Sequence, residues 1–317
     1  MRQRHFENIE TNGVTLRTMV EGEGPLVVLL HGWPQCWHLW RNQIDPIIDA
    51  GYRVAVPNQR GYAGSSAPNE VSAYNIRELA ADAAGIAPAL GYDEFIAIGH
   101  DWGCIVAWNT ALLHKDTCKA VMGLSVPGWR ATKEIVNPPG KDDRFWYIRM
   151  FQTPGLAEPE LESDIERSLL GIYYALSGDS PPLSFVKQLE YPADSKFHEI
   201  FPVPEKLPPW LTQEDIDYYV EHFRSSGFRG PNNWYANVPT NNEITPELKG
   251  KKMTQPAAFA VGALDDDLTI MDNWRERFER AFEDLRFLEV LEGVGHWVPM
   301  EKPAEITALI LRFLKGL

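Results

Sequence analysis

The chain has 317 residues, of which 44% are hydrophobic, enough for one large core and a smaller second unit. Its formal net charge is −14 and it has no block of basic residues, which argues against partners such as nucleic acid or an anionic membrane surface. No apolar run approaches the roughly 18 residues of a membrane span, and no apolar segment of a signal peptide is evident near residue 1. The three cysteines, Cys36, Cys104 and Cys118, lack metal-ligand spacing, so we expect free thiols in a cytoplasmic protein.

The first part of the chain predicts an alternation of strands and helices. Residues 25–30 form a short, continuous apolar run that ends at a His-Gly pair, which is typical of a fully buried strand. Residues 52–56 form a second such run, and a turn rich in Gly, Ser and Pro follows it at 60–68. Residues 78–90 are rich in Ala, and this composition indicates a helix.

The alternation continues through the next 40 residues or so. A third strand is predicted at 95–98, a helix follows the turn at 99–103, and a fourth strand is predicted at 120–126. Strands that alternate with helices in this way form a mostly parallel sheet with helices on both faces. The sequence therefore predicts an α/β fold.

The pattern changes near Pro127. From there the chain becomes irregular and helical, with many prolines and aromatic residues, until the strand pattern resumes at 257–262 and 285–290. Residues 303–314 form an amphipathic helix. An insertion at this point lies above the carboxyl edge of the sheet, where open α/β sheets bind ligands. The expected division is 1–128 for the first part of the α/β core, 129–248 for a helical lid and 249–317 for the second part of the core.

The most informative motif is Gly99-His100-Asp101-Trp102-Gly103, which joins a predicted strand to a predicted helix. Small residues on both sides of the centre allow a sharp turn, so the central side chain is held above the sheet edge, as in a nucleophile elbow. Esterases and lipases have Ser at this centre, whereas this chain has Asp. A carboxylate is ionised at neutral pH and needs no base, and it is suited to displacing a group from a saturated carbon to form an alkyl ester.

A second motif follows the first buried strand at the same edge of the sheet. It is His31-Gly32-Trp33-Pro34, a tight loop that can aim the backbone N–H of Trp33 at the elbow. Together with the N–H of Trp102, it would supply the two donors of an oxyanion hole.

An acidic loop and a histidine follow the two late strands. Of the three aspartates at 265–267, Asp265 comes soonest after its strand and is the expected partner of a histidine, with Asp267 as the second candidate. His296 lies between Gly295 and Trp297 after the last strand and is a candidate base. The order nucleophile, acid, histidine is that of α/β-hydrolase triads.

Three other polar residues near these motifs receive supporting roles or none. His100 is expected to pack on the other side of its strand, and His31 is expected to brace its own loop. Ser125 lies inside an apolar run without flanking elbow glycines, so it is not expected to be a nucleophile.

With these residues the chain resembles the α/β-hydrolase-fold epoxide hydrolases over nearly its whole length. The elbow alone fits dehalogenases as well, so two lid motifs carry the resemblance further. They are Phe145-Trp146-Tyr147, with 151–155 after it, and 226–231, with Asn233-Trp234-Tyr235 after it. Each resembles the segment that carries one of the two lid tyrosines of the family. Two departures, Asn58 for the usual Asp and Ala63 for the usual Gly, fall in a supporting turn.

The resemblance implies a reaction and a role for each site residue. Asp101 attacks a ring carbon of an epoxide, and Tyr147 and Tyr235 give a proton or strong hydrogen bonds to the leaving oxygen, because an alkoxide is a poor leaving group. His296, oriented by Asp265, then activates water that hydrolyses the ester. The product is a vicinal diol, and no metal or organic cofactor is required.

The resemblance also implies what binds. The expected ligands are a small hydrophobic epoxide and water, since the lid is aromatic, and a homodimer is one assembly open to this chain. Residues expected to contact the substrate are Pro34, Trp234 and Trp297.

Two rival hypotheses use the same sequence differently. A haloalkane or haloacid dehalogenase would share the Asp-His-Asp triad, but its lid should offer N–H donors to a halide, for which Trp146 and Trp234 are candidates. A non-catalytic binding protein with this fold usually loses a triad member, and this chain has a candidate for all three.

Overall fold

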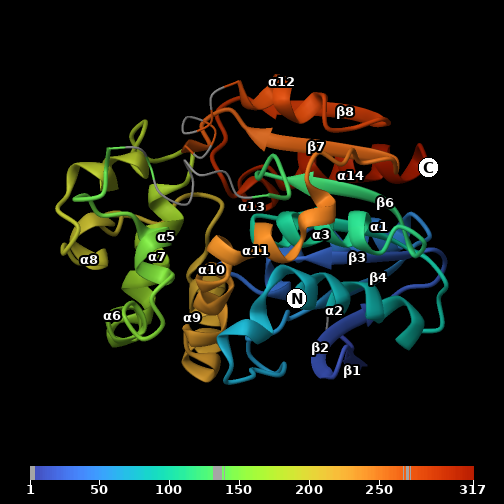
Figure 1. Cartoon of the computed structure of the whole chain (residues 1–317), viewed down its shortest axis with the longest axis horizontal. Helices are drawn as coiled ribbons and strands as arrows, with labels where there is room; N and C mark the ends of the chain where they lie inside the picture. Colours follow the sequence, from blue (N-terminus) through green and yellow to red (C-terminus); the bar gives the residue numbers. More distant parts are fainter. Residues whose placement is uncertain (1–3, 131–137, 139, 267, 269–270, 272) are drawn as a thin grey trace.

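Eight strands in the described part of the chain form a single sheet in the order β1-β2-β4-β3-β5-β6-β7-β8 (Figure 1). The computed structural model describes residues 4–130, 138, 140–266, 268, 271 and 273–317. The strands are β1 (Phe6–Thr11), β2 (Val14–Glu21), β3 (Leu26–Leu30), β4 (Arg53–Pro57), β5 (Phe95–His100), β6 (Cys118–Leu124), β7 (Ala257–Gly262) and β8 (Leu285–Leu291). All pairs from β4 to β8 across the sheet are parallel, which confirms the predicted mostly parallel sheet.

The helices of the α/β core flank this sheet. They are α1 (Ile44–Asp49), α2 (Ile76–Ala89), α3 (Trp102–Leu113), α12 (Trp274–Glu279), α13 (Val298–Glu301) and α14 (Pro303–Lys315). The helices between β6 and β7 are α5 (Tyr147–Phe151), α6 (Glu158–Ser163), α7 (Ile165–Ala175), α8 (Phe197–Ile200), α9 (Gln213–Ser226), α10 (Arg229–Ala236) and α11 (Val238–Ile244). Short 3₁₀ helices occur at Trp37–Trp40, Val71–Tyr74, Val186–Glu190 and Pro246–Leu248.

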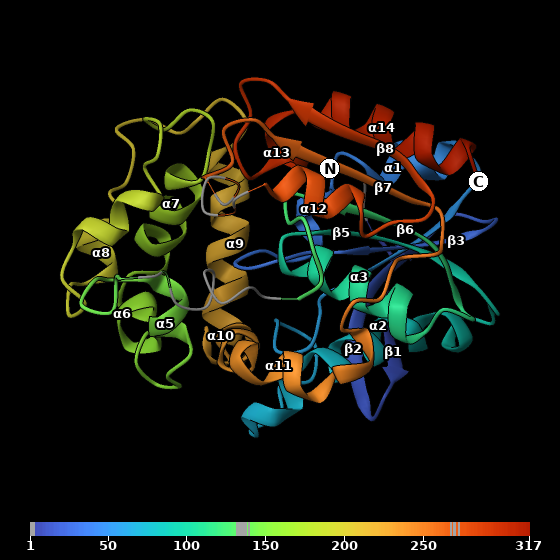
Figure 2. The ribbon, with the colours of Figure 1, turned by 45° about the horizontal axis from the view of Figure 1, so that its top comes forward.

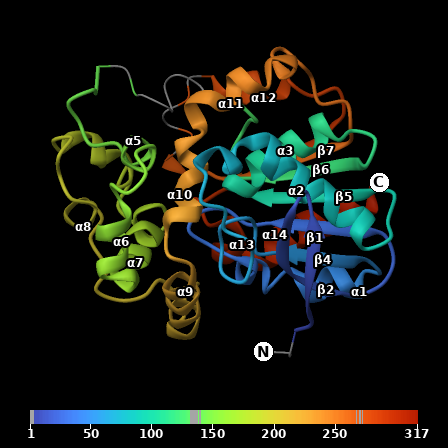
Figure 3. The same cartoon turned by 60° about the horizontal axis from the view of Figure 1, so that its bottom comes forward.

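The central strands are apolar along their whole length because helices cover both faces of the sheet. Every residue of β3, β5 and β7 is buried. Helices α2, α3 and α12 lie on one face, and α1 and α14 lie on the other (Figures 2 and 3). On the second face α14 buries the apolar stripe Ile306, Ile310, Phe313 and Leu314, as its amphipathic pattern predicts.

Two N-terminal strands are absent from the prediction. Strands β1 and β2 form an antiparallel hairpin in which Thr11 pairs with Val14 around a two-residue turn. That turn is Asn12-Gly13, and both residues have positive φ, 46° and 73°. An Asn-Gly pair is a strong hairpin signal, so the sequence did contain the information needed to find these strands.

One strand boundary differs from the prediction in a way that affects the site. The strand predicted at 120–126 is β6, which begins at Cys118 and ends at Leu124. The chain leaves the strand at Ser125, whose φ is 72°, a left-handed conformation that no regular strand contains. Ser125 is fully buried at this position.

Helices α5 to α10 stand beyond the carboxyl ends of the parallel strands, toward which the arrows of β6 and β7 point in Figure 1. We call this group of helices the cap. It occupies the place predicted for a lid, although the division into 1–128, 129–248 and 249–317 stays a prediction. Residues 131–137 and 139 of the predicted lid lie outside the described residues.

Buried polar contacts join the cap to the core. On α9, Asp215 accepts a hydrogen bond from Nε2 of His38 at 2.7 Å and pairs with Nε of Arg41 at 2.8 Å. These partners lie in or beside the first 3₁₀ helix of the core. No helix within the described residues is long and apolar enough to cross a bilayer.

Candidate active site

Asp101 stands at the turn between β5 and α3, with φ 54° and ψ −124°. Its left-handed backbone is the strained conformation expected of a nucleophile elbow. Glycine is needed beside it, because a Cβ on Gly99 would lie 2.0 Å from the carbonyl oxygen of Gly103. The glycine at position 99 thus has a direct steric cause in the sharp turn. The turn raises the Asp101 carboxylate above the carboxyl edge of the sheet.

The loop after β3 reaches the Asp101 carboxylate through its backbone. The N–H of Trp33 donates a hydrogen bond to Oδ1 of Asp101 over 2.6 Å. Trp102 is the first residue of α3, so its N–H has no acceptor within the helix. Of the two predicted oxyanion donors, the N–H of Trp33 therefore contacts the carboxylate, while that of Trp102 belongs to the next residue in the chain, at the N-terminus of α3, which favours negative charge there.

His31 braces this loop, as predicted. Its Nδ1 contacts the carbonyl oxygen of Gly32 at 3.0 Å, and its Nε2 accepts the backbone N–H of Gln59 at 3.1 Å. Burial lowers the pKa of His31 to about 4, so the ring is neutral. Asn58 supports the same region, because its side chain accepts the N–H of Trp37 at 3.0 Å and donates to the carbonyl of Ala63 at 2.8 Å.

His296 lies between two carboxylates. Its Nδ1 is 2.9 Å from Oδ2 of Asp265, and its Nε2 is 3.5 Å from Oδ2 of Asp101. Burial lowers the pKa of the His296 imidazole, but the charges of Asp265 and Asp101 raise it by more, and the net pKa lies well above its usual range. The second candidate partner, Asp267, lies outside the described residues.

The carbonyl oxygen of His296 has two partners that the sequence analysis missed. Oγ of Ser125 donates to it at 2.7 Å, and Nε2 of His100 lies 2.8 Å from it. The expectation that His100 only packs on the far side of its strand is therefore wrong, since its ring lies 5.0 Å from the ring of His296. The available signal was the position of Ser125 and His100 at the carboxyl ends of the adjacent strands β6 and β5.

Two tyrosines of the cap face one another. Tyr147 is the first residue of α5 and Tyr235 lies in α10, and their ring centroids are 5.7 Å apart. The ring of Tyr235 also lies 5.1 Å from that of Trp102, beside the elbow. Burial raises the pKa of Tyr235 well above its usual range, so this phenol stays protonated at neutral pH.

A cavity of about 370 Å³ brings these groups together. Its lining includes Asp101 from the core and both Tyr147 and Tyr235 from the cap. Most of the remaining lining is apolar or aromatic and includes Ile105, Val126, Trp129, Trp146, Val238 and Phe278. A carboxylate and two phenols in one apolar cavity are suited to attack a carbon and to hydrogen-bond an oxygen that leaves it.

The three residues predicted to contact substrate surround the site but do not line this cavity. Nε1 of Trp234 donates to the carbonyl of Arg60 at 3.0 Å, and Nε1 of Trp297 donates to the carbonyl of Tyr173 at 2.8 Å. The carbonyl of Pro34 accepts the hydroxyl of Tyr173 at 2.8 Å. Their polar groups thus connect the cap to the core.

Two further features concern metals and thiols. Within the described residues, no group of three or more His, Cys, Asp or Glu side chains is arranged to hold a metal ion. The cysteines Cys36, Cys104 and Cys118 are buried free thiols, as expected, and burial raises the pKa of Cys36 and of Cys118 to about 12.

Comparison with known proteins finds relatives that match nearly the whole chain. The family model for the alpha/beta hydrolase fold matches residues 25–303. Epoxide hydrolase A of Mycobacterium tuberculosis is 40% identical, and the match covers 98% of this chain and 97% of that protein. Epoxide hydrolase B of the same organism is 34% identical, with 93% and 92% covered.

Solved structures agree with the curated relatives. The crystal structure of epoxide hydrolase A from Mycobacterium thermoresistibile has a TM-score of 0.91 at 41% identity, with 99% of each chain covered. An epoxide hydrolase from an endophytic Streptomyces has a TM-score of 0.94 at 34% identity, with 100% of this chain and 96% of that chain covered. The likeness includes the cap as well as the sheet, because it extends over the whole chain.

Proposed function

The chain belongs to the epoxide hydrolases of the α/β-hydrolase fold, and from this premise we propose that it opens epoxides through a covalent ester on Asp101. The observation that carries the proposal is the shared cavity, which Asp101 lines together with Tyr147 and Tyr235. A substrate in this cavity meets the carboxylate from the core and the phenols from the cap. Attack and protonation can therefore occur on opposite sides of the ring.

In the first half-reaction, a carboxylate oxygen of Asp101 forms a bond to one ring carbon, and the bond between that carbon and the ring oxygen breaks. The ring oxygen takes a proton from the phenol pair of Tyr147 and Tyr235, which is later restored from water. The raised pKa of Tyr235 keeps its proton in place until an alkoxide develops. Hydrogen bonds to this developing charge lower the barrier.

In the second half-reaction, Nε2 of His296 takes a proton from water, and the hydroxide attacks the carboxyl carbon of Asp101. The tetrahedral oxyanion is stabilised by the N–H groups of Trp33 and Trp102. In its collapse the bond between the carboxyl carbon and the alkyl oxygen breaks, the alkoxide takes the proton of the former hydroxide to complete the diol, and Asp101 returns as a carboxylate. The proton that His296 took from water passes to the phenoxide of the Tyr147 and Tyr235 pair. Asp265, 2.9 Å from Nδ1, holds the ring so that Nε2 faces the ester.

The cavity favours hydrophobic epoxides of modest size. Its volume of about 370 Å³ is near the lower end of the range for small-molecule sites, and its walls are mainly aromatic and aliphatic. An apolar aryl or alkyl epoxide would bury its surface against these walls, although the lining also includes the cationic side chains of Arg130, Lys251 and Arg277. The homodimer and the cytoplasmic location stay predictions.

The rival hypotheses are less well supported. Trp146 lines the cavity, as a halide donor in a dehalogenase would, but the relatives and solved structures described above are named epoxide hydrolases. A non-catalytic binding protein does not fit membership of this enzyme family. Release of halide from a haloalkane or haloacid, assayed beside hydrolysis of styrene oxide, separates the two activities.

Isotope labelling tests the proposed nucleophile. In a single turnover in water enriched in heavy oxygen, with enzyme in excess over styrene oxide, the label should enter Asp101 and not the diol. The reason is that the diol receives an oxygen that the carboxylate already carried, and water replaces that oxygen in the enzyme. Full label in the first-turnover diol would mean direct attack by water and would overturn the assignment of Asp101.

A further inference from the structure

The carboxylate of Glu301, at the end of α13, holds three backbone amides. Its Oε2 accepts the N–H of Gly178 at 2.8 Å and that of Gly295 at 3.0 Å, and its Oε1 accepts the N–H of Trp297 at 2.9 Å. Hydrogen bonds to a charged acceptor are stronger than neutral ones. Glu301 is neither in the cavity lining nor in the triad, so the proposed mechanism leaves its role open.

Two of these amides flank the proposed base. Gly295 and Trp297 are the neighbours of His296 in the chain, so Glu301 fixes the backbone on both sides of it. The ring of His296 has two directed contacts, Nδ1 with Asp265 and Nε2 toward Asp101. A rotation of the backbone at 296 would disturb both contacts at once.

The third amide belongs to the cap. Gly178 lies in the turn after α7, and the same turn supplies the carbonyl of Leu176, which accepts the N–H of His296 at 2.8 Å. The two backbones meet so closely that a Cβ on Gly295 would lie 2.4 Å from the Leu176 oxygen. Glu301 therefore connects the loop that carries His296 to the cap turn that contacts it.

We propose that Glu301 is a positioning residue for His296 and that it makes the turn after α7 part of the support of the base. The inference rests on the proposed function, since it assigns Glu301 to the second half-reaction. Ring opening needs no base, because Asp101 carries its own charge. Ester hydrolysis needs Nε2, water and the carboxyl carbon in line, and a misplacement of about 1 Å can cost about 10²-fold in rate.

The test is Glu301→Gln, which preserves the shape of the side chain. Its NH₂ group cannot accept a hydrogen bond, so at least one of the three amides loses its acceptor. We expect ester hydrolysis to slow by about 10- to 100-fold. The rate of ring opening should change by less than about threefold, which is much less than the rate loss caused by removing one hydrogen-bond donor. Rapid quenching with styrene oxide and intact-protein mass spectrometry would measure both steps, and the alkyl-enzyme should accumulate in the variant.

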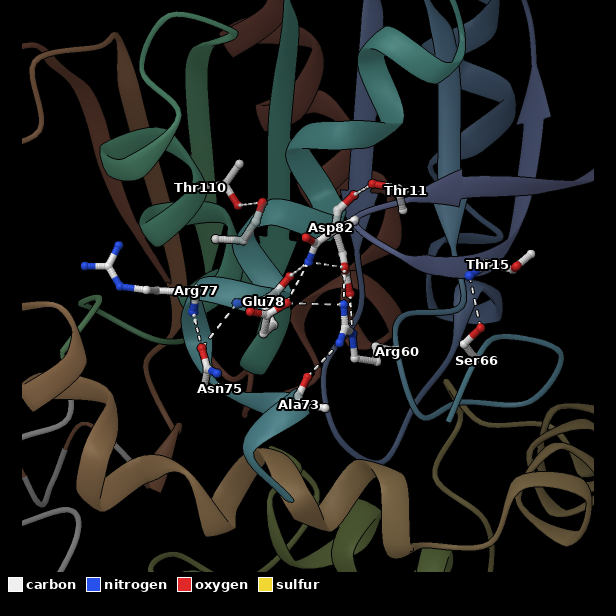
Figure 4. A network of polar contacts seen from close by, with 12 residues as sticks. Thr11, Thr15, Arg60, Ser66, Ala73, Asn75, Arg77, Glu78, Asp82 and Thr110 are labelled. Atoms are coloured by element: carbon white, nitrogen blue, oxygen red, sulfur yellow. Dashed lines mark hydrogen bonds and ion pairs between the residues drawn. The ribbon is translucent and has the colours of Figure 1, made fainter. Parts of the chain in front are cut away.

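A matched control separates positioning from loss of stability. Asp82 on α2 is a buried carboxylate that accepts Nε and Nη2 of Arg60 at 2.7 and 2.6 Å (Figure 4). Asp82→Asn makes the same chemical change away from the His296 loop, so it should lower the denaturation midpoint without changing the ratio of the two rates. Glu301→Asp keeps the charged acceptor on a shorter side chain, so it should recover part of the hydrolysis rate.

Each outcome decides the matter. If the ratio of the two rates in Glu301→Gln equals that of the wild type, whether both steps slow equally or neither slows, the inference is overturned. If that variant does not fold, Glu301→Asp carries the same test, and equal slowing of its two steps overturns the inference. Failure of the proposed function is distinguishable, because the wild-type enzyme would then form no alkyl-enzyme at all.

Discussion

The N–H of Trp33 donates a hydrogen bond to Oδ1 of Asp101 over 2.6 Å, whereas Oδ2 of the same carboxylate faces Nε2 of His296 at 3.5 Å. The two oxygens are therefore in different surroundings before any substrate arrives. If Oδ2 attacks the epoxide, Oδ1 becomes the carbonyl oxygen of the ester and is already in contact with an oxyanion donor. In the proposed mechanism, the resting hydrogen bond would thus prepare the site for the second half-reaction.

Substitution of the two cap tyrosines should slow ring opening. Tyr147→Phe and Tyr235→Phe should each slow alkylation by about 10²- to 10³-fold, since loss of one donor to a developing oxyanion costs about 2.7–4 kcal/mol. The double variant should form almost no ester. The measurement is the rate of alkylation in a rapid-quench experiment with styrene oxide.

The control for these variants is Tyr191→Phe, because Tyr191 is a partly exposed tyrosine of the lid segment outside the cavity lining. It should alkylate at the wild-type rate. A double Tyr147→Phe, Tyr235→Phe variant that alkylates almost as fast as the wild type would remove the phenols from the mechanism and favour the dehalogenase hypothesis.

Replacement of the proposed base should separate the two half-reactions. In His296→Gln, ring opening should be largely intact while ester hydrolysis is blocked, because water, with a pKa near 15.7, is a poor nucleophile without a base. Intact-protein mass spectrometry should find an adduct equal to the substrate mass, and proteolysis should map it to the peptide that holds Asp101. A folded but unmodified variant would mean that His296 is needed earlier.

Asp265→Asn should give a weaker form of the same result. The His296 ring would remain, but it would lose the carboxylate 2.9 Å from Nδ1 that fixes its orientation and favours its protonated form. The ester should therefore accumulate to a lower level than in His296→Gln, and it should decay slowly. Decay at the wild-type rate would show that Asp265 is not the partner of the base and would direct attention to Asp267.

Much of this fold could be predicted because its central strands and the elbow have strong local signals. The apolar runs that became β3, β5 and β7 are buried throughout. Gly99 has a steric cause within the turn itself, whereas a Cβ on Gly103 would lie 2.1 Å from the carbonyl oxygen of Leu30 in β3. The cap helices were predicted only as a region, because most of them are short, prolines occur throughout the segment, and packing against neighbours determines where the short helices begin and end. Helix α9 is the exception, since it has 14 residues and a capping box at Thr212 and Asp215.

The supports of His296 could not be predicted in the same way. Ser125 and His100 contact its carbonyl from 171 and 196 residues away in the sequence. Glu301 is near in sequence, but its third partner, Gly178, is 123 residues away in the cap. The position of Ser125 and His100 at strand ends could indicate that they lie near the site, but each of these contacts involves a backbone atom, so no pattern of residue types predicts the contact itself.

The charge of Asp101 should control the protonation of His296. Burial lowers the pKa of His296, but the carboxylates of Asp265 and Asp101 raise it by more, so the net pKa lies well above its usual range. In the proposed mechanism, ester formation removes the charge of Asp101, which should lower this pKa and favour the neutral form of His296 for the second half-reaction. Asp101→Asn mimics that loss, so an NMR titration should give His296 a lower pKa in the variant. Equal values would contradict this coupling.

Three neutral histidines should make the fold sensitive to acid. Burial lowers the pKa of His31 to about 4, and those of His100 and His222 to about 3. In the unfolded chain each histidine has a pKa near 6.5, so below that pH the unfolded state binds protons that the folded state excludes. The free energy of unfolding should therefore fall between about pH 6.5 and 4, by up to about 1.4 kcal/mol per pH unit for each histidine.

His222→Gln tests this pH dependence at a histidine outside the proposed triad. The Nε2 atom of His222 accepts the N–H of Ala63 at 3.3 Å, and the amide oxygen of Gln can take its place. The variant lacks the imidazole that binds an extra proton on unfolding. The free energy of unfolding, measured in urea at several pH values, should therefore fall less steeply below pH 6.5, and the slope should decrease by about the contribution of one histidine. The control is His5→Gln, because the side chain of His5 is 68% exposed, and its slope should match the wild type. An unchanged slope in His222→Gln would mean that His222 exchanges protons as freely in the fold as in the unfolded chain.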